Sequence, residues 1–393
     1  MPKFRNDLIY KDIEENGENF VVAYDQNMSV EQPIRLPGKL FHLLQKLDGK
    51  IGLSDFSKLL IDEFGDQITT QSIVQLINEL EFLGYFETET HDLLKKNLRP
   101  MVCAGNSYSK DPDELKEYLD ALLNTVDKNK IKPGADTVIV PHIDYQIGEG
   151  SHKAYASAYH ALRETEADLF VIFGTSHYGN SGRFMMSKRD YQTPLGKVKN
   201  EIKLLEKLQE RLPYDLTIDE VAHRLEHSIE LQIILLKYVF ADRDISVFPV
   251  LTGSFHDHVL KRSLPGKDND IRTFLDSLNE VIEGSGKKAA FIASVDFAHV
   301  GRRFDDDFDA ESILDQLKEE DKILIDHLNR GDSDSFFSKV SENGDKRKIC
   351  GLSPIYSLLQ MRKKKQGELL HYHQWNDSPT GSAVTFASIA YYD

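Results

Sequence analysis

The sequence predicts an α/β fold in which helices cover both faces of a mainly parallel sheet, preceded by a small helical domain. Three observations lead to this prediction. After about residue 135, short continuous apolar runs alternate with helical segments, a pattern typical of strands buried on both faces. Before residue 90, apolar residues recur at helical spacing instead. The length of 393 residues agrees with two domains, which we place at residues 1–95 and 96–393.

Three amphipathic segments make up the predicted N-terminal domain. Residues 34–47 and 53–64 each have a helical pattern, and a third helix can be capped by Thr69 or Thr70 and ended by Gly84. The apolar face of this third helix comprises Ile73, Leu76, Ile77, Leu80 and Leu83, and a short strand is expected at Tyr85 and Phe86. Three helices and a β wing are typical of a winged-helix module, and the segment also resembles the small PqqD-like peptide-recognition modules.

The charge of the chain argues against nucleic acid as a partner. The sequence has 48 Lys and Arg residues against 64 Asp and Glu residues, a formal net charge of −16. Residues 1–90 hold eight basic and sixteen acidic residues, which gives −8 to this part and −8 to the remainder. Both parts would repel a phosphate backbone. For residues 1–90 we therefore expect a peptide or protein partner, or a purely structural role.

Cysteine usage and hydropathy predict a cytoplasmic protein without membrane contact. The chain contains only Cys103 and Cys350, which excludes a disulfide scaffold and a cysteine-rich zinc module. It has no run of about 18 apolar residues, and its first residues lack the apolar segment of a signal peptide.

Five apolar runs are predicted as strands of the larger domain: TVIV (137–140), LFVIFG (169–174), ISVFPVLTG (245–253), AAFIAS (289–294) and VTFASIAYY (384–392). Helices are expected between them near residues 151–163, 226–240, 268–282 and 320–330. In open α/β sheets, ligands bind beyond the carboxyl ends of the strands. The residues that follow each run are therefore the first candidates for a functional site.

Three of these strands are followed by a histidine. His142 comes after the first run, His177 after the second and His299 after the fourth. Histidine is the commonest metal ligand and the usual acid or base near neutral pH, so we expect the three to share a site. Alternatively, each is a turn or core residue with satisfied hydrogen bonds, and Asp296 with His299 forms a purely structural hydrogen-bonded pair.

Cys350 adds a thiol to these candidates. Ser353 and Pro354 have the character of an N-cap and a first helical residue, so Cys350 is expected in the turn that enters a helix. A helix N-terminus favours the thiolate, which is the form that binds metals or attacks electrophiles. Cys103 has no comparable setting, and we interpret it as a packed small hydrophobic residue.

The start of the helix 226–240 supplies two further candidates, Glu226 and His227. Glu226 and Glu230 are expected on one helical face beside His227, although acidic residues in a first turn also simply stabilise a helix. Two histidine pairs receive no role. His256 and His258 are expected in an exposed loop, and His371 and His373 on one face of a strand.

Six segments, in this order, resemble the MEMO family, whose prokaryotic members are called AmmeMemoRadiSam system protein B: VIVPHIDY, FGTSHYG, YQTPLGKV, EHSIELQ, ASVDFAH and CGLSPI. The segment RPMVCAGNSYSKDPDELKEYLDALL is also similar to the N-terminal segment of that family. The resemblance covers roughly residues 99–393 and leaves residues 1–90 as an added module.

The resemblance implies a fold similar to that of class III extradiol ring-cleavage dioxygenases, which use non-haem iron. It implies that His142, His177 and Cys350 bind a metal and that Asp296 and His299 are an additional active-site pair. The usual facial triad of non-haem iron oxygenases consists of two histidines and one carboxylate. A thiolate in place of this carboxylate suits iron, copper or zinc and disfavours magnesium or calcium. A site with three protein ligands leaves positions open for a substrate.

The residues after the first histidine depart from this resemblance. Many family members have an Ala-Gly pair where this chain has Ile143 and Asp144. Asp144 is then a further ligand, a carboxylate that orients an imidazole, or a turn residue.

Three functions are compatible with these residues. The leading hypothesis is a metal-dependent redox enzyme with iron or copper, or with zinc as a further option. In it, His299, oriented by Asp296, acts as acid or base on a small-molecule or peptide substrate. The second is a non-catalytic adaptor that binds a peptide in the same cleft and uses residues 1–90 as a peptide reader. The third is a metal-free hydrolase with Cys350 as nucleophile and His299 as base.

Overall fold

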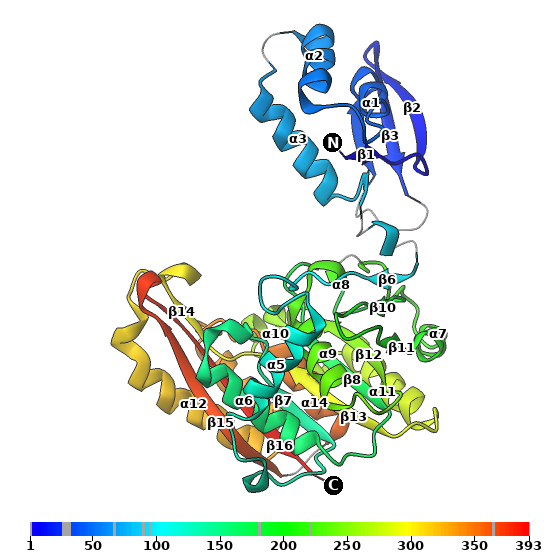
Figure 1. Ribbon diagram of the computed structural model, residues 1–393. Coiled ribbons are helices and arrows are strands. Elements are labelled where there is room, and N and C mark those ends of the chain that lie inside the picture. Colours follow the sequence, from blue (N-terminus) through cyan, green and yellow to red (C-terminus); the bar gives the residue numbers. More distant parts are fainter. Residues whose placement is uncertain are drawn as a thin grey trace. The chain divides into compact units, whose positions relative to one another are not determined.

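The computed structural model describes residues 2–25, 33–65, 68–88, 91–93, 96–179, 182–220, 222–363 and 366–392 (Figure 1). The chain divides into two compact units, residues 1–100 and 101–393. The domain boundary predicted near residue 95 lies outside the described residues, because residues 94 and 95 are not among them.

The N-terminal unit combines a small antiparallel sheet with helices. Its described strands and helices are β1 (Lys3–Phe4), β2 (Ile9–Glu15), β3 (Glu18–Tyr24), β4 (Ile34–Pro37), α1 (Gly38–Leu44), α2 (Leu53–Phe64), α3 (Thr70–Phe82), β5 (Phe86–Glu87) and β6 (Leu98–Arg99). The strands β2, β3 and β4 pair in this order, and β1 pairs with β5. Leucine, isoleucine and phenylalanine side chains from both the sheet and the helices form one core.

The predicted helices of this unit are present, with one correction. Thr69 caps α3, and Gly84, with φ +86°, follows its C-terminus. The helix predicted over 34–47 is shorter, because residues 34–37 form β4 and Pro37 favours extended backbone before it. The hairpin of β2 and β3 was not predicted, although its turn, Asn16-Gly17, has positive φ at both residues and is a strong hairpin signal.

In the part of the chain that the structure describes, nine strands form the sheet of the larger unit: β7 (Thr137–Val140), β8 (Leu169–Thr175), β9 (Phe184–Met186), β11 (Lys199–Asn200), β12 (Ser246–Thr252), β13 (Ala289–Ser294), β14 (His299–Gly301), β15 (Gly367–Asp377) and β16 (Ser382–Tyr391). The order is β11-β12-β8-β13-β7-β16-β14, with β9 also paired to β12 and β15 to β16. The first five strands of this spatial order, from β11 to β7, run parallel to one another. β16 runs antiparallel to β7, β14 and β15. It is joined to β15 by a short turn, which makes these two strands an antiparallel hairpin.

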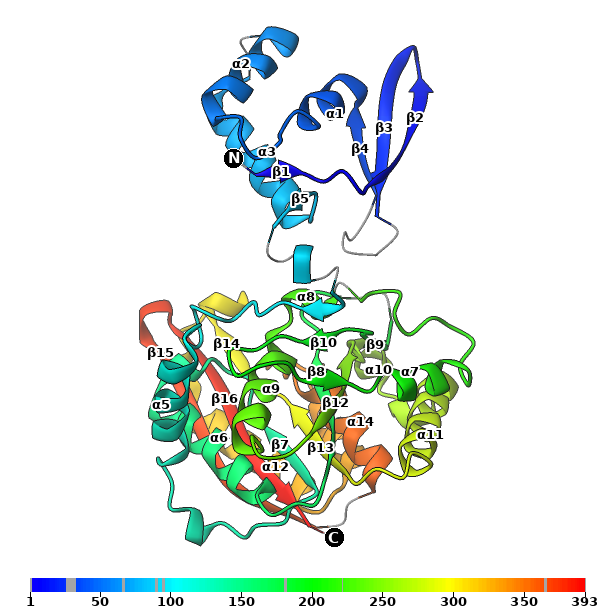
Figure 2. The same ribbon diagram turned by 45° about the vertical axis from the view of Figure 1, so that its right-hand side comes forward.

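Helices cover both faces of this sheet, as the continuous apolar runs predict (Figure 2). One core contains α5 (Pro112–Leu123), α6 (Glu149–Leu162) and α9 (His227–Val239), and the other α7 (Ile202–Gln209), α11 (Asn269–Glu283), α12 (Leu314–Asn329), α13 (Ser333–Ser341) and α14 (Leu352–Arg362). Alternate residues of β8 divide between them: Phe170 and Ile172 join the first core, and Leu169, Val171 and Phe173 join the second.

The remaining elements of the larger unit are short. They are β10 (Asp190–Tyr191), α8 (Ala222–Leu225), α10 (His256–Lys261) and the 3₁₀ turns Lys128–Lys130, Tyr145–Ile147, Pro265–Lys267, Arg302–Phe304, Ala310–Ile313 and Ser378–Thr380. Among the described residues, no helix has both the length and the apolar character that crossing a bilayer would require.

Candidate metal centre

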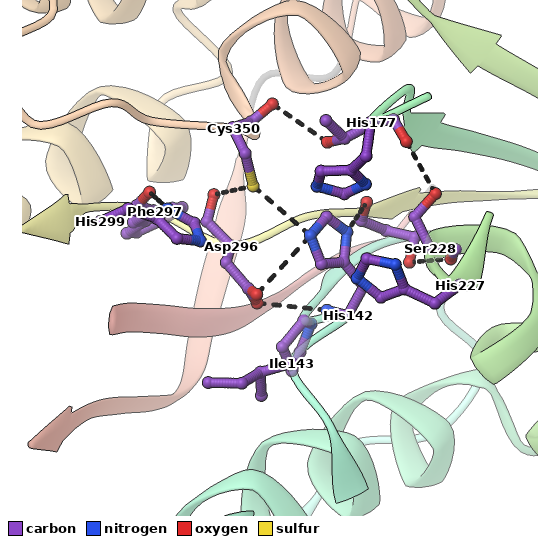
Figure 3. A network of polar contacts seen from close by, with 12 residues as sticks. His142, Ile143, His177, His227, Ser228, Asp296, Phe297, His299 and Cys350 are labelled. Carbon is purple, nitrogen blue, oxygen red and sulfur yellow. Dashed lines mark hydrogen bonds and ion pairs between the residues drawn. The ribbon is translucent and has the colours of Figure 1, made fainter. Parts of the chain in front are cut away.

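The structure brings His142, His177 and Cys350 together at one end of the sheet (Figure 3). His142 follows β7 and His177 follows β8, two strands separated only by β13, while Cys350 precedes α14. One ligand atom from each of the three residues lies within 4.8 Å of the other two. Such a group of two imidazoles and a thiol has the composition of a transition-metal site.

The ring of His142 is oriented by the backbone. Its Nδ1 lies 2.9 Å from the carbonyl oxygen of Ser294, so this nitrogen carries the proton and donates it. The Nε2 lone pair is then directed into the cluster, 3.5 Å from Cys350 Sγ. Burial, together with the nearby His177 and His227, holds the pKa of His142 well below its usual range, so the ring is neutral and free to act as a ligand.

The ring of His177 is oriented by a buried carboxylate. Glu226 accepts hydrogen bonds from both the backbone N–H and Nδ1 of His177, each at 2.8 Å. Burial raises the pKa of Glu226, but the hydrogen bonds from His177 and the electrostatic interactions with His177 and His227 outweigh this effect and lower the pKa to about 2. The ionised carboxylate thereby fixes the Nδ1–H tautomer and leaves Nε2 for a ligand, the usual arrangement behind a metal-binding histidine.

A glycine in β8 allows Glu226 to reach this position. A Cβ atom at Gly174 would lie 2.6 Å from Ser228 Oγ, so only a bare backbone lets the first turn of α9 pack against the end of β8. Ser228 Oγ donates to the carbonyl of Thr175 at 2.9 Å and closes this contact. Glu226 is the N-cap of α9 and accepts from the Ser228 N–H, so the same residue both starts the helix and holds His177.

Cys350 lies in the turn before α14, but its surroundings differ from the prediction. Its Sγ lies 3.5 Å from both His142 Nε2 and the carbonyl oxygen of Asp296. Burial, with the charge of Asp296, raises the pKa of the thiol well above its ordinary value, so the helix N-terminus does not by itself produce a thiolate. The predicted cap was also wrong: Gly351 is the N-cap, and Ser353 Oγ instead accepts from the N–H of Phe255.

Asp296 and His299 both line the cavity beside this cluster, but they do not form a pair. Although the structure describes both residues, it shows no hydrogen bond between them. Asp296 accepts the N–H of His142 at 3.2 Å, and burial raises its pKa to about 7. His299 Nδ1 donates to the carbonyl of Phe297 at 3.1 Å, and burial lowers its pKa to about 4. The expectation that Asp296 orients His299 was therefore wrong.

His227 is the remaining imidazole of the site. Its ring stacks on that of His177 with centroids 4.7 Å apart, and it lies 5.1 Å from the ring of His142. His177, Glu226 and His227 form a second group whose ligand atoms lie within 4.8 Å of one another. Glu230 is not part of the site, because its carboxylate accepts from the N–H groups of Val102 and Cys103 and from the Tyr108 hydroxyl.

Asp144 acts as a turn residue, one of the three roles that the sequence left open. Its carboxylate accepts from the N–H of Gln146 and caps the 3₁₀ turn Tyr145–Ile147. The other oxygen accepts from Ser107 Oγ at 2.7 Å. Asp144 also lines the cavity, but it is in neither ligand group.

The cavity beside the cluster has a volume of about 420 Å³. The sequence predictions include six of its polar lining residues, namely His142, Asp144, His177, His227, Asp296 and His299. They miss Ser107 and Arg303, and also three apolar residues, Phe304, Trp375 and Val384. These three residues come from separate segments and share no spacing that could reveal them. Trp375 is nevertheless the only tryptophan of the chain, which was a usable signal.

The histidines outside the site also test the sequence predictions. The exposed loop expected at His256 and His258 is the helix α10, and His258 is buried with its Nδ1 3.0 Å from Ser263 Oγ. Burial of the neighbouring Phe255 against the core explains the difference. His371 and His373 lie on one face of β15, as predicted, with stacked rings 6.2 Å apart.

Comparisons with known proteins agree with the motifs. The family model described as Memo-like protein matches residues 99–390. A MEMO1 family protein of Aquifex aeolicus is 30% identical over 403 residues, covering 100% of both chains. A MEMO1 family protein of Methanosarcina barkeri is 28% identical and covers 70% of this chain and 92% of its own length. One of Thermus thermophilus is 24% identical and covers 84% of this chain and 96% of its own.

Proposed function

The chain belongs to the Memo-like protein family, and from this premise we propose that it is a metal-dependent redox enzyme. His142, His177 and Cys350 bind one iron or copper ion in this proposal, with zinc as the alternative ion. The observation that carries it is the convergence of two imidazoles and one thiol to within 4.8 Å, contributed by three distant segments.

The donor set fits a metal ion. Both histidines use Nδ1 for a hydrogen bond and leave Nε2 toward the cluster. In a tetrahedral site with metal–nitrogen bonds of about 2.0 Å and a metal–sulfur bond of about 2.3 Å, the nitrogen and sulfur atoms lie roughly 3.5 Å apart. His142 Nε2 and Cys350 Sγ are separated by 3.5 Å.

The same donors restrict the kind of ion. Imidazole and thiolate ligands suit iron, copper and zinc, whereas magnesium and calcium require oxygen ligands. The positive charge of a bound ion also favours the thiolate, which offsets the effect of burial on Cys350. A bound iron or copper ion would supply one-electron redox chemistry and an electrophilic centre.

Two residues of the cavity are suited to proton transfer. His299 is neutral near pH 7, because burial lowers its pKa to about 4, so its imidazole is in the proton-accepting form but is a weak base. Asp296 has a pKa of about 7 and is therefore present both with and without its proton at neutral pH. Each residue acts separately, since each is held by its own backbone contact.

The test is the metal content of anaerobically purified protein. We expect about one transition-metal ion per chain in the wild type, lost in Cys350→Ala and in His142→Ala. Cys103→Ala removes the other thiol and His256→Ala removes an exposed histidine, and both should retain the ion. Cobalt substitution gives a second readout. The sulfur-to-cobalt charge-transfer absorption should disappear in Cys350→Ala and remain in Cys103→Ala. A wild type without metal, or full retention by Cys350→Ala, would contradict the proposal.

For the N-terminal unit we propose the adaptor role as a second function. Its net charge of −8 over residues 1–90 favours a basic peptide. Among the residues that the structure describes, β2 and β4 are the edge strands of its three-stranded sheet, where an extended peptide can add. Deletion of residues 1–100 should abolish binding of such a peptide and leave the metal content unchanged. Retained peptide binding would show that the unit is not the reader.

The contacts argue against His299 as the base of a metal-free hydrolase, because the imidazole beside Cys350 Sγ is that of His142. Cys350 Sγ contacts His142, whereas the Nδ1 of His299 is engaged with Phe297. A nucleophilic cysteine needs its base within hydrogen-bond reach.

A further inference from the structure

The cavity beside the proposed metal centre has two unlike walls. The polar wall consists of His142, His177, His227, Asp296 and His299. The apolar wall consists of Ile143, Ile147, Phe304, Trp375 and Val384. A ligand that fills this space therefore meets both apolar and polar side chains, and the two sets adjoin where the rings of His299 and Phe304 lie 5.1 Å apart.

The apolar wall is built on a small hydrophobic cluster of its own. Ile143, Val384 and Phe386 are buried in this cluster, while Phe304 and Trp375 pack against it and stay half-buried. Large aromatic side chains left partly open inside a concave site are the surfaces that ligands cover. The two aromatic rings favour a flat apolar body on the ligand.

Arg303 supplies a positive charge to the same cavity. Its side chain is 58% exposed and has a long ion pair of 3.8 Å with Asp377. The backbone N–H of Arg303 donates to Ser382 Oγ at 2.9 Å, which fixes the chain below the guanidinium. Of the two lining carboxylates, Asp144 accepts from Ser107 and Gln146, and Asp296 accepts from the backbone N–H of His142. A guanidinium group in this position matches the geometry of a carboxylate.

We propose that the cavity binds a small carboxylate with a flat, apolar body. The body lies against Phe304 and Trp375, the carboxylate pairs with Arg303, and the opposite end faces the histidines. The volume of about 420 Å³ is near the lower end of ligand pockets, which limits the body to about one or two rings. The inference rests on the proposed function in one respect, since the end that faces the histidines also faces the metal.

The single tryptophan offers a direct measurement. Trp375 lines the cavity, and no other tryptophan contributes to the intrinsic fluorescence. Benzoate and its neutral isostere benzamide are titrated into the full-length protein, both as purified and after incubation with the metal ion. We expect a saturable fluorescence change with benzoate and an affinity at least about tenfold lower for benzamide, which corresponds to about 1.4 kcal/mol.

Two arginine variants separate recognition from net charge. Arg303→Gln should lower the affinity for benzoate at least about tenfold and leave the affinity for benzamide unchanged. Arg302→Gln removes the same charge from the adjacent exposed residue, which does not line the cavity, and should stay within about twofold of the wild type. Equal affinities for benzoate and benzamide, or an unchanged affinity of Arg303→Gln for benzoate, would overturn the proposal.

Metal analysis of the same samples distinguishes the two proposals. Arg303-dependent benzoate binding by a protein that takes up no metal supports the carboxylate site and contradicts the metal centre. A protein that holds metal through Cys350 but binds benzoate and benzamide equally well supports the metal centre and contradicts the carboxylate site. The far-ultraviolet circular dichroism of each variant verifies that a lost affinity is not a loss of fold.

Discussion

Glu226 and Glu230 lie one turn apart at the start of α9, and both are buried, yet they serve different regions of the molecule. Glu226 accepts from the backbone and ring of His177 and so belongs to the candidate metal centre. Glu230 accepts from two backbone N–H groups, of Val102 and Cys103, and from the hydroxyl of Tyr108. The two carboxylates therefore make the same kind of contact: each holds a loop by its backbone and one polar side chain.

The difference lies in the partner side chain. Glu226 orients an imidazole whose other nitrogen faces the cluster, whereas Glu230 holds a phenol that has no further role in the site. A buried carboxylate on a helix is thus a way to anchor a loop, and it becomes part of a functional site only when the loop carries the right residue. The following variants test this division.

Glu230→Ala should give the largest effect, and the effect should be on stability. The substitution removes the acceptor of the Val102 and Cys103 N–H groups and of the Tyr108 hydroxyl. Each buried donor that loses its acceptor costs about 1–3 kcal/mol, so we expect a total loss of about 3–5 kcal/mol. Urea unfolding of the metal-free protein measures it. A loss below about 1 kcal/mol would show that the loop is held by other contacts.

Glu226→Gln should weaken metal binding about 10- to 100-fold, because the substitution removes the negative charge of the carboxylate that accepts from His177 Nδ1 and fixes the tautomer of this ring. Competition with a chelator measures the affinity. Glu230→Gln is the matched control and should keep the wild-type affinity within about twofold. Equal weakening by both substitutions would remove the distinction between the two carboxylates.

Acidification should reduce the stabilising contribution of Glu226. Its pKa is about 2 in the folded protein against an ordinary value of 4.5, so the contribution is complete above about pH 5 and is lost as the pH falls toward 2. The destabilisation caused by Glu226→Gln in metal-free protein should therefore shrink by about 2 kcal/mol between pH 5 and pH 3. Urea unfolding at both pH values tests this, and a destabilisation that stays constant would contradict it.

Tyr108→Phe should give the smallest effect, about 1 kcal/mol of stability. It removes one of the hydrogen bonds to Glu230 and leaves those from Val102 and Cys103 in place. Metal content should not change. A loss of metal in this variant would show that the segment held by Glu230, residues 102–108, contributes to metal binding.

Much of the larger unit could be predicted because each strand carries its own signal. The five apolar runs coincide with β7, β8, β12, β13 and β16, since strands buried on both faces carry few polar residues and no charged ones. The histidines after β7 and β8 could be found for the same reason, because the carboxyl ends of parallel strands meet at one edge.

What could not be predicted depends on contacts between distant segments. Nothing near Asp296 and His299 in the sequence shows that backbone groups of His142 and Phe297 engage them separately. Likewise, the acidic residues of α9 have the same local pattern, and only the folded chain shows that one meets His177 and the other Tyr108. The apolar wall of the cavity also forms only after β15 and β16 have joined the sheet.

The place of β16 in the sheet determines when the site can form during synthesis. This strand, residues 382–391, lies between β7 and β14, so the sheet beside His142 is incomplete until it arrives. At a synthesis rate of about 5–20 residues per second, it follows His177 by roughly 10–40 s. Throughout that interval the nascent chain exposes two imidazoles without a finished sheet around them. An ion that needs all three ligands can therefore bind only after Cys350 has been synthesised.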